Sequence, residues 1–229
     1  MLTVNEFAKH FDLALLAPNV QEAAVVEACQ TAAKYQVNSV NVNSCWINVA
    51  KEVLAGSGVG HSAVIGFPYG TAISKVKYLE LEEMLKVGCS ACDMVINIGA
   101  LKDGNLTLVR DEVKTFADMC RDAKADSKLI FEVGFLTDEE IATLTKICCE
   151  YGITYVKTAT GSQAFPDMNQ VQIMKDNLSG DTKIKVSGVP RTFTLAAAMF
   201  LFDHMGVKLV GSRSAGKLVD QYAAYLKTL

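Results

Sequence analysis

The sequence predicts a (β/α)8 TIM barrel, formed by a single domain over residues 1–229. Eight short apolar runs, rich in β-forming residues, alternate with longer amphipathic segments along the whole chain. Half of the residues are apolar, which is enough for one sizeable core, and no Pro-, Ser- or charge-rich linker divides the chain. Alternation by itself also fits a doubly wound open sheet. That alternative is disfavoured because the G-x-G-x-x-G fingerprint is absent after the first strand.

The expected elements follow one another in strict alternation. The strands are predicted at residues 13–16, 39–42, 63–66, 93–98, 128–133, 153–157, 183–186 and 208–211. Helical patterns follow at residues 20–35, 44–55, 72–87, 106–123, 138–151, 168–177, 192–202 and 215–227. The helix over 138–151 has the clearest start, because Thr137 is a good N-cap and Glu140 stands at the capping-box position.

Composition excludes several classes of partner. Twenty-two basic against 25 acidic residues give a net charge of −3, which argues against nucleic acid or an anionic membrane as a partner. No segment is typical of a signal peptide or of a transmembrane helix. Seven scattered cysteines favour a reducing cytoplasm, and we interpret the C-x-x-C pattern of Cys89 and Cys92 as structural. Three dispersed histidines do not indicate a metal site, so no cofactor is expected.

In a barrel of this kind, the active site is built at the carboxyl ends of the strands. The polar residues predicted there or beneath are Asp12, Asn41, Asp93, Asn97, Glu132, Lys157, Thr158, Lys185, Ser187, Ser212 and Ser214.

Two lysines and one aspartate carry the expected chemistry. Lys157 leaves the sixth predicted strand and Lys185 the seventh, so the two ammonium groups are expected to be close neighbours. Burial and mutual repulsion both lower the pKa of a lysine, which favours a nucleophilic amine. Asp93, in an otherwise apolar strand, should pair with a cation or transfer protons. The competing interpretations are a Lys157 that extends to solvent and a purely structural Lys185–Asp93 ion pair. Lys183 is expected to reach solvent at the opposite rim.

Three glycines follow the last three predicted strands and indicate an anion site. Gly161, Gly188 and Gly211 stand where loops open into helices, and such loops present backbone N–H groups to a phosphate. The segment Ser212-Arg213-Ser214 can add hydroxyl donors and a positive charge.

Several segments resemble blocks of the deoxyribose-phosphate aldolase family. They are residues 93–101 (DMVINIGAL), 155–161 (YVKTATG) and 185–188 (KVSG), with weaker matches at 64–70 (VIGFPYG) and 132–134 (EVG). The resemblance covers residues from about Asp12 to Ser214. It implies a class I aldolase on a (β/α)8 barrel that needs no metal. Such an enzyme reversibly cleaves 2-deoxy-D-ribose 5-phosphate to D-glyceraldehyde 3-phosphate and acetaldehyde, in deoxyribose phosphate catabolism.

The resemblance also implies roles for individual residues. Lys157 matches the Schiff-base lysine, Lys185 the neighbouring lysine that tunes its pKa, and Asp93 the residue that pairs with Lys185 and relays protons. Thr158 and Glu132 are candidates for orienting groups. The substrate-binding residues expected are Asp12, Thr158, Gly161, Ser187, Gly188, Gly211, Ser212, Arg213 and Ser214. The partners would be a phosphorylated sugar and an aldehyde. If copies of the chain associate, the commonest assembly is a homodimer.

The chain departs from the family pattern around the expected pocket. The first strand, usually D-H-T-L-L-K-P, reads DLALLAP here, and Asn41 replaces a cysteine that is typical of the second strand. Gly188 is followed by Val189, Pro190 and Arg191 rather than by a second glycine, and Arg213 stands where a small residue is common. These changes keep two alternatives open: a Schiff-base aldolase for another aldehyde or sugar phosphate, and a noncatalytic sugar-phosphate-binding barrel.

Overall fold

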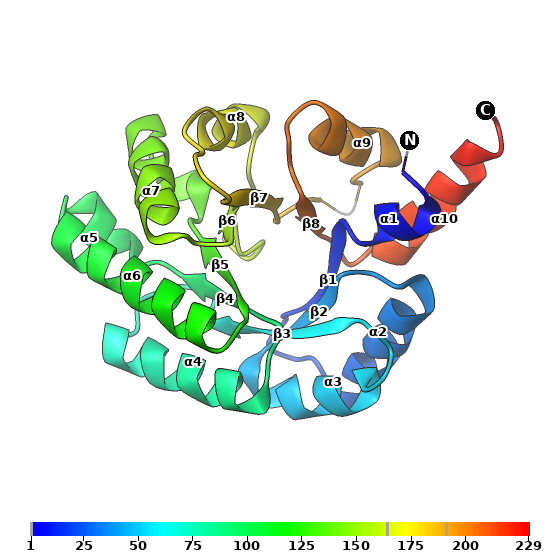
Figure 1. Cartoon of the computed structure of the whole chain (residues 1–229), viewed down its shortest axis with the longest axis horizontal. Helices are drawn as coiled ribbons and strands as arrows, with labels where there is room; N and C mark the ends of the chain where they lie inside the picture. Colours follow the sequence, from blue (N-terminus) through cyan, green and yellow to red (C-terminus); the bar gives the residue numbers. More distant parts are fainter. Residues whose placement is uncertain (1, 164, 191) are drawn as a thin grey trace.

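The computed structural model, which describes residues 2–163, 165–190 and 192–229, is a closed barrel of eight parallel strands in the order β1 to β8 (Figure 1). The prediction of a TIM barrel is confirmed; the departure noted at Arg191 lies outside the described residues. The strands are β1 (Phe11–Leu15), β2 (Ser39–Val42), β3 (Gly60–Ile65), β4 (Ala91–Val95), β5 (Asp126–Ile130), β6 (Tyr155–Lys157), β7 (Lys183–Val186) and β8 (Leu209–Gly211).

Two strands, β4 and β5, end three residues earlier than predicted, because polar residues turn the chain out of the sheet. After β4, Asn97 caps a short helix by accepting a hydrogen bond from the Ala100 N–H at 3.0 Å, so the expected strand at 93–98 is wrong at its end. After β5, Glu132 adopts a left-handed conformation with φ of 55° and begins a 3₁₀ turn. Both changes place polar side chains at the carboxyl rim of the barrel.

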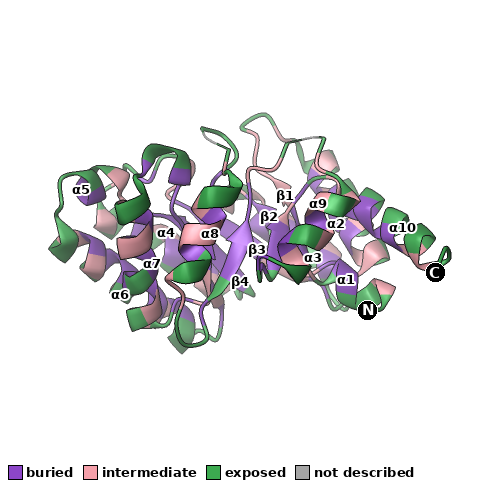
Figure 2. Cartoon of the chain, turned by 90° about the horizontal axis from the view of Figure 1, so that it is seen from above, coloured by how far each residue is buried: buried purple, intermediate pink, exposed green. Residues whose placement is uncertain are grey.

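The helices lie outside the barrel (Figure 1), and the longer ones have both buried and exposed residues (Figure 2). They are α1 (Val4–Ala8), α2 (Glu22–Tyr35), α3 (Ile47–Leu54), α4 (Ser74–Val87), α5 (Ile98–Lys102), α6 (Leu106–Asp122), α7 (Asp138–Tyr151), α8 (Met168–Asp176), α9 (Leu195–Asp203) and α10 (Ala215–Leu226), with 3₁₀ turns η1 (Ser44–Trp46) and η2 (Val133–Phe135). The capping box expected at Thr137 and Glu140 is present. Helices α1 and α5 were not predicted, and the segment expected as one helix at 44–55 is divided into η1 and α3.

Aromatic packing closes the barrel where its first and last strands meet. Helix α1 lies beside α10 (Figure 1), and the Phe7 ring stacks on Tyr222 with ring centroids 4.0 Å apart. Phe11 of β1 and Phe202 of α9 complete the cluster in edge-on contacts. This apolar cluster holds β1 against β8. Strands β1 and β8 are paired over only a short length.

A buried ion pair between two helices fixes the carboxyl end of β4. The Lys77 ammonium of α4 lies 2.7 Å from the Glu112 carboxylate of α6, and neither side chain is exposed. Lys77 also donates to the Val95 carbonyl at 3.1 Å, while Glu112 accepts a hydrogen bond from the Asn97 N–H at 3.1 Å. We refer to this pair as the helix clamp. It anchors the strand that carries Asp93.

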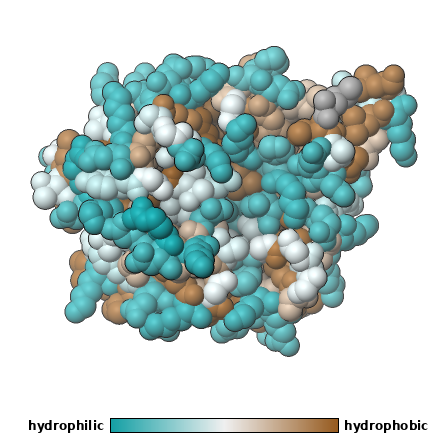
Figure 3. Space-filling model, viewed as in Figure 1, coloured by the Kyte–Doolittle hydropathy of each residue, from teal (hydrophilic) through white to brown (hydrophobic). Residues whose placement is uncertain are grey.

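No described helix is both long enough and apolar enough to cross a bilayer. The face seen in Figure 3 is mostly hydrophilic, with its apolar groups in separate patches.

Candidate active site

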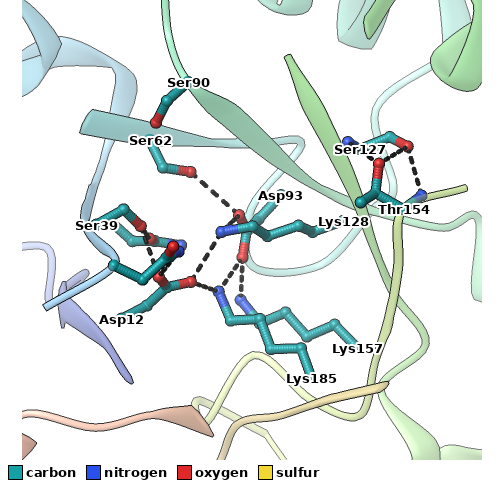
Figure 4. A network of polar contacts seen from close by, with 12 residues as sticks. Asp12, Ser39, Ser62, Ser90, Asp93, Ser127, Lys128, Thr154, Lys157 and Lys185 are labelled. Atoms are coloured by element: carbon teal, nitrogen blue, oxygen red, sulfur yellow. Dashed lines mark hydrogen bonds and ion pairs between the residues drawn. The ribbon is translucent and has the colours of Figure 1, made fainter. Parts of the chain in front are cut away.

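Lys157 and Lys185 meet on one carboxylate in the barrel interior (Figure 4). The two lysines are register partners on the neighbouring strands β6 and β7. Each ammonium nitrogen lies 2.8 Å from Oδ2 of Asp93, which comes from β4. The expected proximity of the lysines and the expected Lys185–Asp93 pair are both confirmed. Lys183, by contrast, is exposed at the start of β7, as predicted.

A second aspartate and a third lysine extend this contact. Lys185 also donates to Asp12 Oδ2 at 2.6 Å, and Lys128 donates to the same oxygen at 2.8 Å (Figure 4). Lys128 lies 3.9 Å from the other aspartate, at Asp93 Oδ1. We call these five residues, Asp12, Asp93, Lys128, Lys157 and Lys185, the buried ion cluster, because at most 3% of any of their side chains is exposed.

Neutral side chains hold the two aspartates from the opposite wall. Asp12 Oδ1 accepts hydrogen bonds from Asn38 Nδ2 at 2.8 Å and Ser39 Oγ at 2.7 Å. Ser62 Oγ donates to Asp93 Oδ1 at 3.2 Å. Each carboxylate therefore accepts hydrogen bonds from lysines on one oxygen and from neutral donors on the other, which keeps both in a fixed orientation.

Burial and neighbouring charges separate the pKa values of the cluster. Burial and the ammonium group of Lys185 outweigh the attraction of Asp93 and lower the pKa of Lys157 to about 8. Burial disfavours the charge of Lys128, but the carboxylates of Asp12 and Asp93 more than compensate and raise its pKa. Burial also disfavours ionised aspartates, yet the lysines hold the pKa of Asp12 and Asp93 well below the usual range. The pKa of Lys157 is thus lowered toward neutral pH.

A cavity of about 540 Å³ opens above the cluster at the carboxyl ends of β1, β2, β6, β7 and β8. Of the cluster, Lys157 and Lys185 line it. The other lining residues are Ala14, Leu16, Ala17, Pro18, Asn41, Thr160, Gly161, Ser162, Phe165, Ser187, Gly188, Val189, Pro190, Gly211, Ser212, Arg213 and Ser214. Seven of the nine predicted substrate-binding residues are in this set, so the structure brings them to one cavity.

Asp12 and Thr158, the remaining two, do not line the cavity. Asp12 lies beneath it in the ion cluster. Thr158 is fully buried, where its hydroxyl donates to the Ser187 carbonyl and accepts from the Ser187 N–H, both at 2.9 Å. Thr158 therefore ties the loop after β6 to the loop after β7 without reaching the cavity.

The rim of the cavity is built for close backbone approach. Gly161 has φ of 80°, and a Cβ placed there would lie 3.4 Å from Gly188 Cα, so a side chain would be strained. In the last loop, the Ser214 N–H donates to Ser212 Oγ at 3.1 Å, while Arg213 is exposed. Gly161, Ser212, Arg213 and Ser214 all line the same opening, so residues with hydroxyl and guanidinium groups surround it.

Lys128 is a site residue that the sequence interpretation missed. The predicted strand begins at Lys128, and a lysine at a strand end usually extends to solvent. The strand begins two residues earlier, at Asp126, so Lys128 lies within the sheet on the inward face shared with Ile130. The sequence did contain a signal: Lys128 and Ile130 are two residues apart, so in a strand both side chains lie on the same face.

The ionisable groups of the buried ion cluster are lysine and aspartate side chains. No three His, Cys, Asp or Glu side chains among the described residues are grouped as metal ligands.

Glu132, predicted as an orienting group, accepts a hydrogen bond from the Thr160 N–H at 2.9 Å and so supports the cavity wall.

A lysine with a lowered pKa, buried beneath the mouth of a (β/α)8 barrel and held by an aspartate, defines a class I aldolase type of site. No family model matches the chain. The chain is 35% identical over 217 residues to the deoxyribose-phosphate aldolase of Clostridium kluyveri, covering 94% of this chain and 98% of that one. It is also 35% identical over 222 residues to that of Caldicellulosiruptor saccharolyticus, covering 96% and 100%.

A solved structure shares the fold as well. The tetrameric deoxyribose phosphate aldolase of Aeropyrum pernix superimposes with a TM-score of 0.86 at 23% identity, over 97% of this chain and 93% of that one. By its relatives, the chain belongs to the deoxyribose-phosphate aldolase family.

Proposed function

We propose that the chain reversibly cleaves 2-deoxy-D-ribose 5-phosphate to D-glyceraldehyde 3-phosphate and acetaldehyde through a Schiff base on Lys157. The observation that carries the proposal is the position of Lys157, a buried lysine that lines the cavity with its ammonium group 2.8 Å from Asp93. Burial in this position lowers the pKa of Lys157 to about 8. A substantial fraction of neutral amine is then present near neutral pH, as attack on an aldehyde requires. Membership of the family supports this substrate.

The proposed reaction begins when the neutral Lys157 amine attacks C1 of the open-chain sugar. Loss of water from the carbinolamine gives an iminium ion. The C3 hydroxyl then loses its proton, the C2–C3 bond breaks, and its electrons move toward the iminium nitrogen to form an enamine. Protonation of C2 and hydrolysis release acetaldehyde and regenerate the amine.

The other members of the cluster have supporting roles in this scheme. Asp93 is ionised before the reaction begins, because its pKa is well below the usual range, and it orients both lysines; it can therefore accept the C3 hydroxyl proton and later return a proton to C2. We assign proton transfer at the C3 hydroxyl and at C2 to Asp93 through a water molecule. Lys185 contributes the positive charge that lowers the pKa of Lys157.

The rim residues are proposed to bind the phosphate group. Three glycines at the rim, Gly161, Gly188 and Gly211, have no side chain and allow a phosphate to come close to the backbone. Hydroxyl groups are supplied by Ser187, Ser212 and Ser214. Arg213 can add a charged, bidentate contact from its exposed position.

The same proposal includes a cytoplasmic location and self-association. All seven cysteines are unpaired, which fits a reducing compartment. Exposed apolar side chains on and next to α4, at Ile73, Val76 and Leu79, offer a surface for a second copy in a homodimer.

Borohydride trapping tests the function directly. The protein is reduced in the presence of deoxyribose 5-phosphate or acetaldehyde, and its peptides are mapped by mass. We expect an adduct on Lys157, and we expect Lys157→Ala to lose both the adduct and at least about 1,000-fold in kcat. Lys183→Ala, which removes the exposed lysine of β7, is the matched control and should keep both. Normal turnover by Lys157→Ala would end the assignment.

The altered pocket favours one alternative, a Schiff-base aldolase with a different preferred sugar phosphate or aldehyde. Ala14 and Ala17 leave the first-strand wall without the polar side chains of the family pattern. A panel of sugar phosphates decides this, and deoxyribose 5-phosphate as the best substrate would exclude the alternative. A noncatalytic sugar-phosphate-binding barrel would require that no aldehyde is trapped at all.

A further inference from the structure

Asn41 places an amide group with an unused hydrogen-bonding end beside the cavity. The residue is only 1% exposed, lines the cavity, and its Nδ2 has no hydrogen-bond partner among the described residues. A buried polar atom without a partner costs free energy unless a ligand or water satisfies it. The Asn41 amide is therefore a candidate hydrogen-bond donor for a polar atom of a ligand in the cavity.

The other end of the amide is fixed by the ion cluster. Asn41 Oδ1 lies 3.1 Å from Ser39 Oγ, and the same hydroxyl lies 2.7 Å from Asp12 Oδ1. Asp12 in turn contacts Lys185. This chain of contacts holds the amide in one position relative to the lysines.

Space is present next to the amide as well. The register partner of Asn41 on β1 is Ala14, whose small side chain also lines the cavity. Strand β2 stands opposite β6 in the eight-stranded order, so Asn41 and Lys157 face one cavity from opposite walls. A free amide end and an adjacent small residue together form a subsite for one polar group.

The depth of Asn41 selects which part of a bound sugar it meets. Asn41 lies one inward position above Ser39, and therefore just above the ion cluster. With C1 bonded to Lys157 and the phosphate at the rim, the deepest atoms of the sugar are C1 and C2. The group that occupies the subsite is then a substituent on C2.

We infer that Asn41 and Ala14 form a subsite for a hydroxyl group on C2, so that the enzyme also acts on 2-hydroxylated aldehydes. A hydroxyl oxygen accepts hydrogen bonds, so a C2 hydroxyl can accept the one that the free Asn41 Nδ2 offers. The inference rests on the proposed aldolase function and extends its substrate class to D-ribose 5-phosphate.

The added reaction needs no further reagent. Cleavage of C2–C3 in the ribose iminium leaves an enamine that carries the hydroxyl on C2. Protonation of C2 and hydrolysis release glycolaldehyde in place of acetaldehyde, and the other product is again glyceraldehyde 3-phosphate.

The test compares kcat/KM for D-ribose 5-phosphate with that for deoxyribose 5-phosphate. We expect the ribose-to-deoxyribose ratio to fall about 10-fold in Asn41→Ala, as loss of one hydrogen bond implies. Asn41→Leu, which keeps the volume but removes both polar atoms, should give the same fall, so that an effect of added space is excluded. Asn43→Ala is the matched control, since Asn43 lines a different cavity, and the ratio should not change.

Trapping with borohydride separates failure of the inference from failure of the function. A glycolaldehyde adduct on Lys157 of the wild-type protein, reduced in Asn41→Ala relative to the acetaldehyde adduct, supports the subsite. If deoxyribose 5-phosphate is cleaved but ribose 5-phosphate is not, or the ratio stays constant in both Asn41 variants, the inference alone is overturned. If neither sugar is cleaved and neither aldehyde is trapped, the proposed function fails with it.

Discussion

At the scale of single residues, the central feature is the opposition between burial and ion pairing at Lys157. Burial and the charge of Lys185 lower its pKa, whereas Asp93 raises it, and the balance lies at about 8. An amine is nucleophilic only when deprotonated, so formation of the carbinolamine should rise with pH up to this value and then level off.

Removal of Lys185 should change this pH dependence. In Lys185→Leu one cation that repels the Lys157 ammonium is lost while Asp93 stays, so the pKa of Lys157 rises above about 8. The rising limb of kcat/KM against pH then moves to higher pH. Near neutral pH the rate falls about 10-fold for every pH unit by which the limb moves. A pH–rate profile from pH 6 to 10 measures this displacement. An unchanged limb with reduced kcat would mean that Lys185 acts in some other way.

At the scale of elements, the helix clamp explains how α4 and α6 fix the end of β4. Glu112 accepts from Lys77, Ser74 and the Asn97 N–H, and Lys77 donates to Val95. Burial lowers the pKa of Lys77, and Glu112 counteracts this, which is the signature of a buried pair.

Breaking the clamp should destabilise the fold strongly. Lys77→Met leaves the Glu112 carboxylate buried without its cation, and the expected loss is about 3–5 kcal/mol in the free energy of unfolding. Urea denaturation followed by circular dichroism measures it. The matched control is Lys86→Met, which removes an exposed lysine of the same helix from its pairs with Glu82 and Glu83. Its transition should be almost unchanged, and equal losses in both variants would contradict the role of burial.

Much of the architecture could be predicted from the sequence, because the hydrophobic residues of strands and helices repeat with different spacings. Eight strand–helix repeats in succession are compatible with few folds. Lys157, Lys185 and Asp93 stood out because charged residues are rare within apolar strands. Lys77 and Glu112 could not be recognised in this way, since charged residues on amphipathic helices usually face solvent. Lys128 was missed because a boundary error of two residues moved it to a strand end. The unused amide of Asn41 depends on three-dimensional contacts that no local pattern encodes.

At the scale of the whole molecule, the buried aspartates link stability to pH. Their folded-state pKa values lie below the unfolded value of 3.8, so the unfolded chain binds more protons at low pH. Their contribution is fully present above about pH 4 and is lost as pH falls below it.

Acid should therefore weaken the fold steeply. Below about pH 3.8, the free energy of unfolding should fall by roughly 1.4 kcal/mol per pH unit for each of the two aspartates. Urea titrations between pH 7 and about pH 2 measure this slope, which approaches its full value roughly one pH unit below 3.8. Asp181→Asn, which changes an exposed carboxylate in the turn before β7, is the matched control and should leave the slope unchanged. A flat profile below pH 4 would contradict the assigned protonation of Asp12 and Asp93.

The make-up of the buried ion cluster also has a consequence for the electron flow of the proposed reaction. With Lys157 deprotonated, two lysines balance two aspartates, and the cluster carries no net charge. Formation of the iminium returns a positive charge to that nitrogen, in surroundings that disfavour it. Flow of electrons from the C2–C3 bond to the nitrogen restores neutrality. The charge balance of the buried ion cluster thus favours two steps of the reaction. One is the release of a proton from Lys157, and the other is the collapse of the iminium to the enamine.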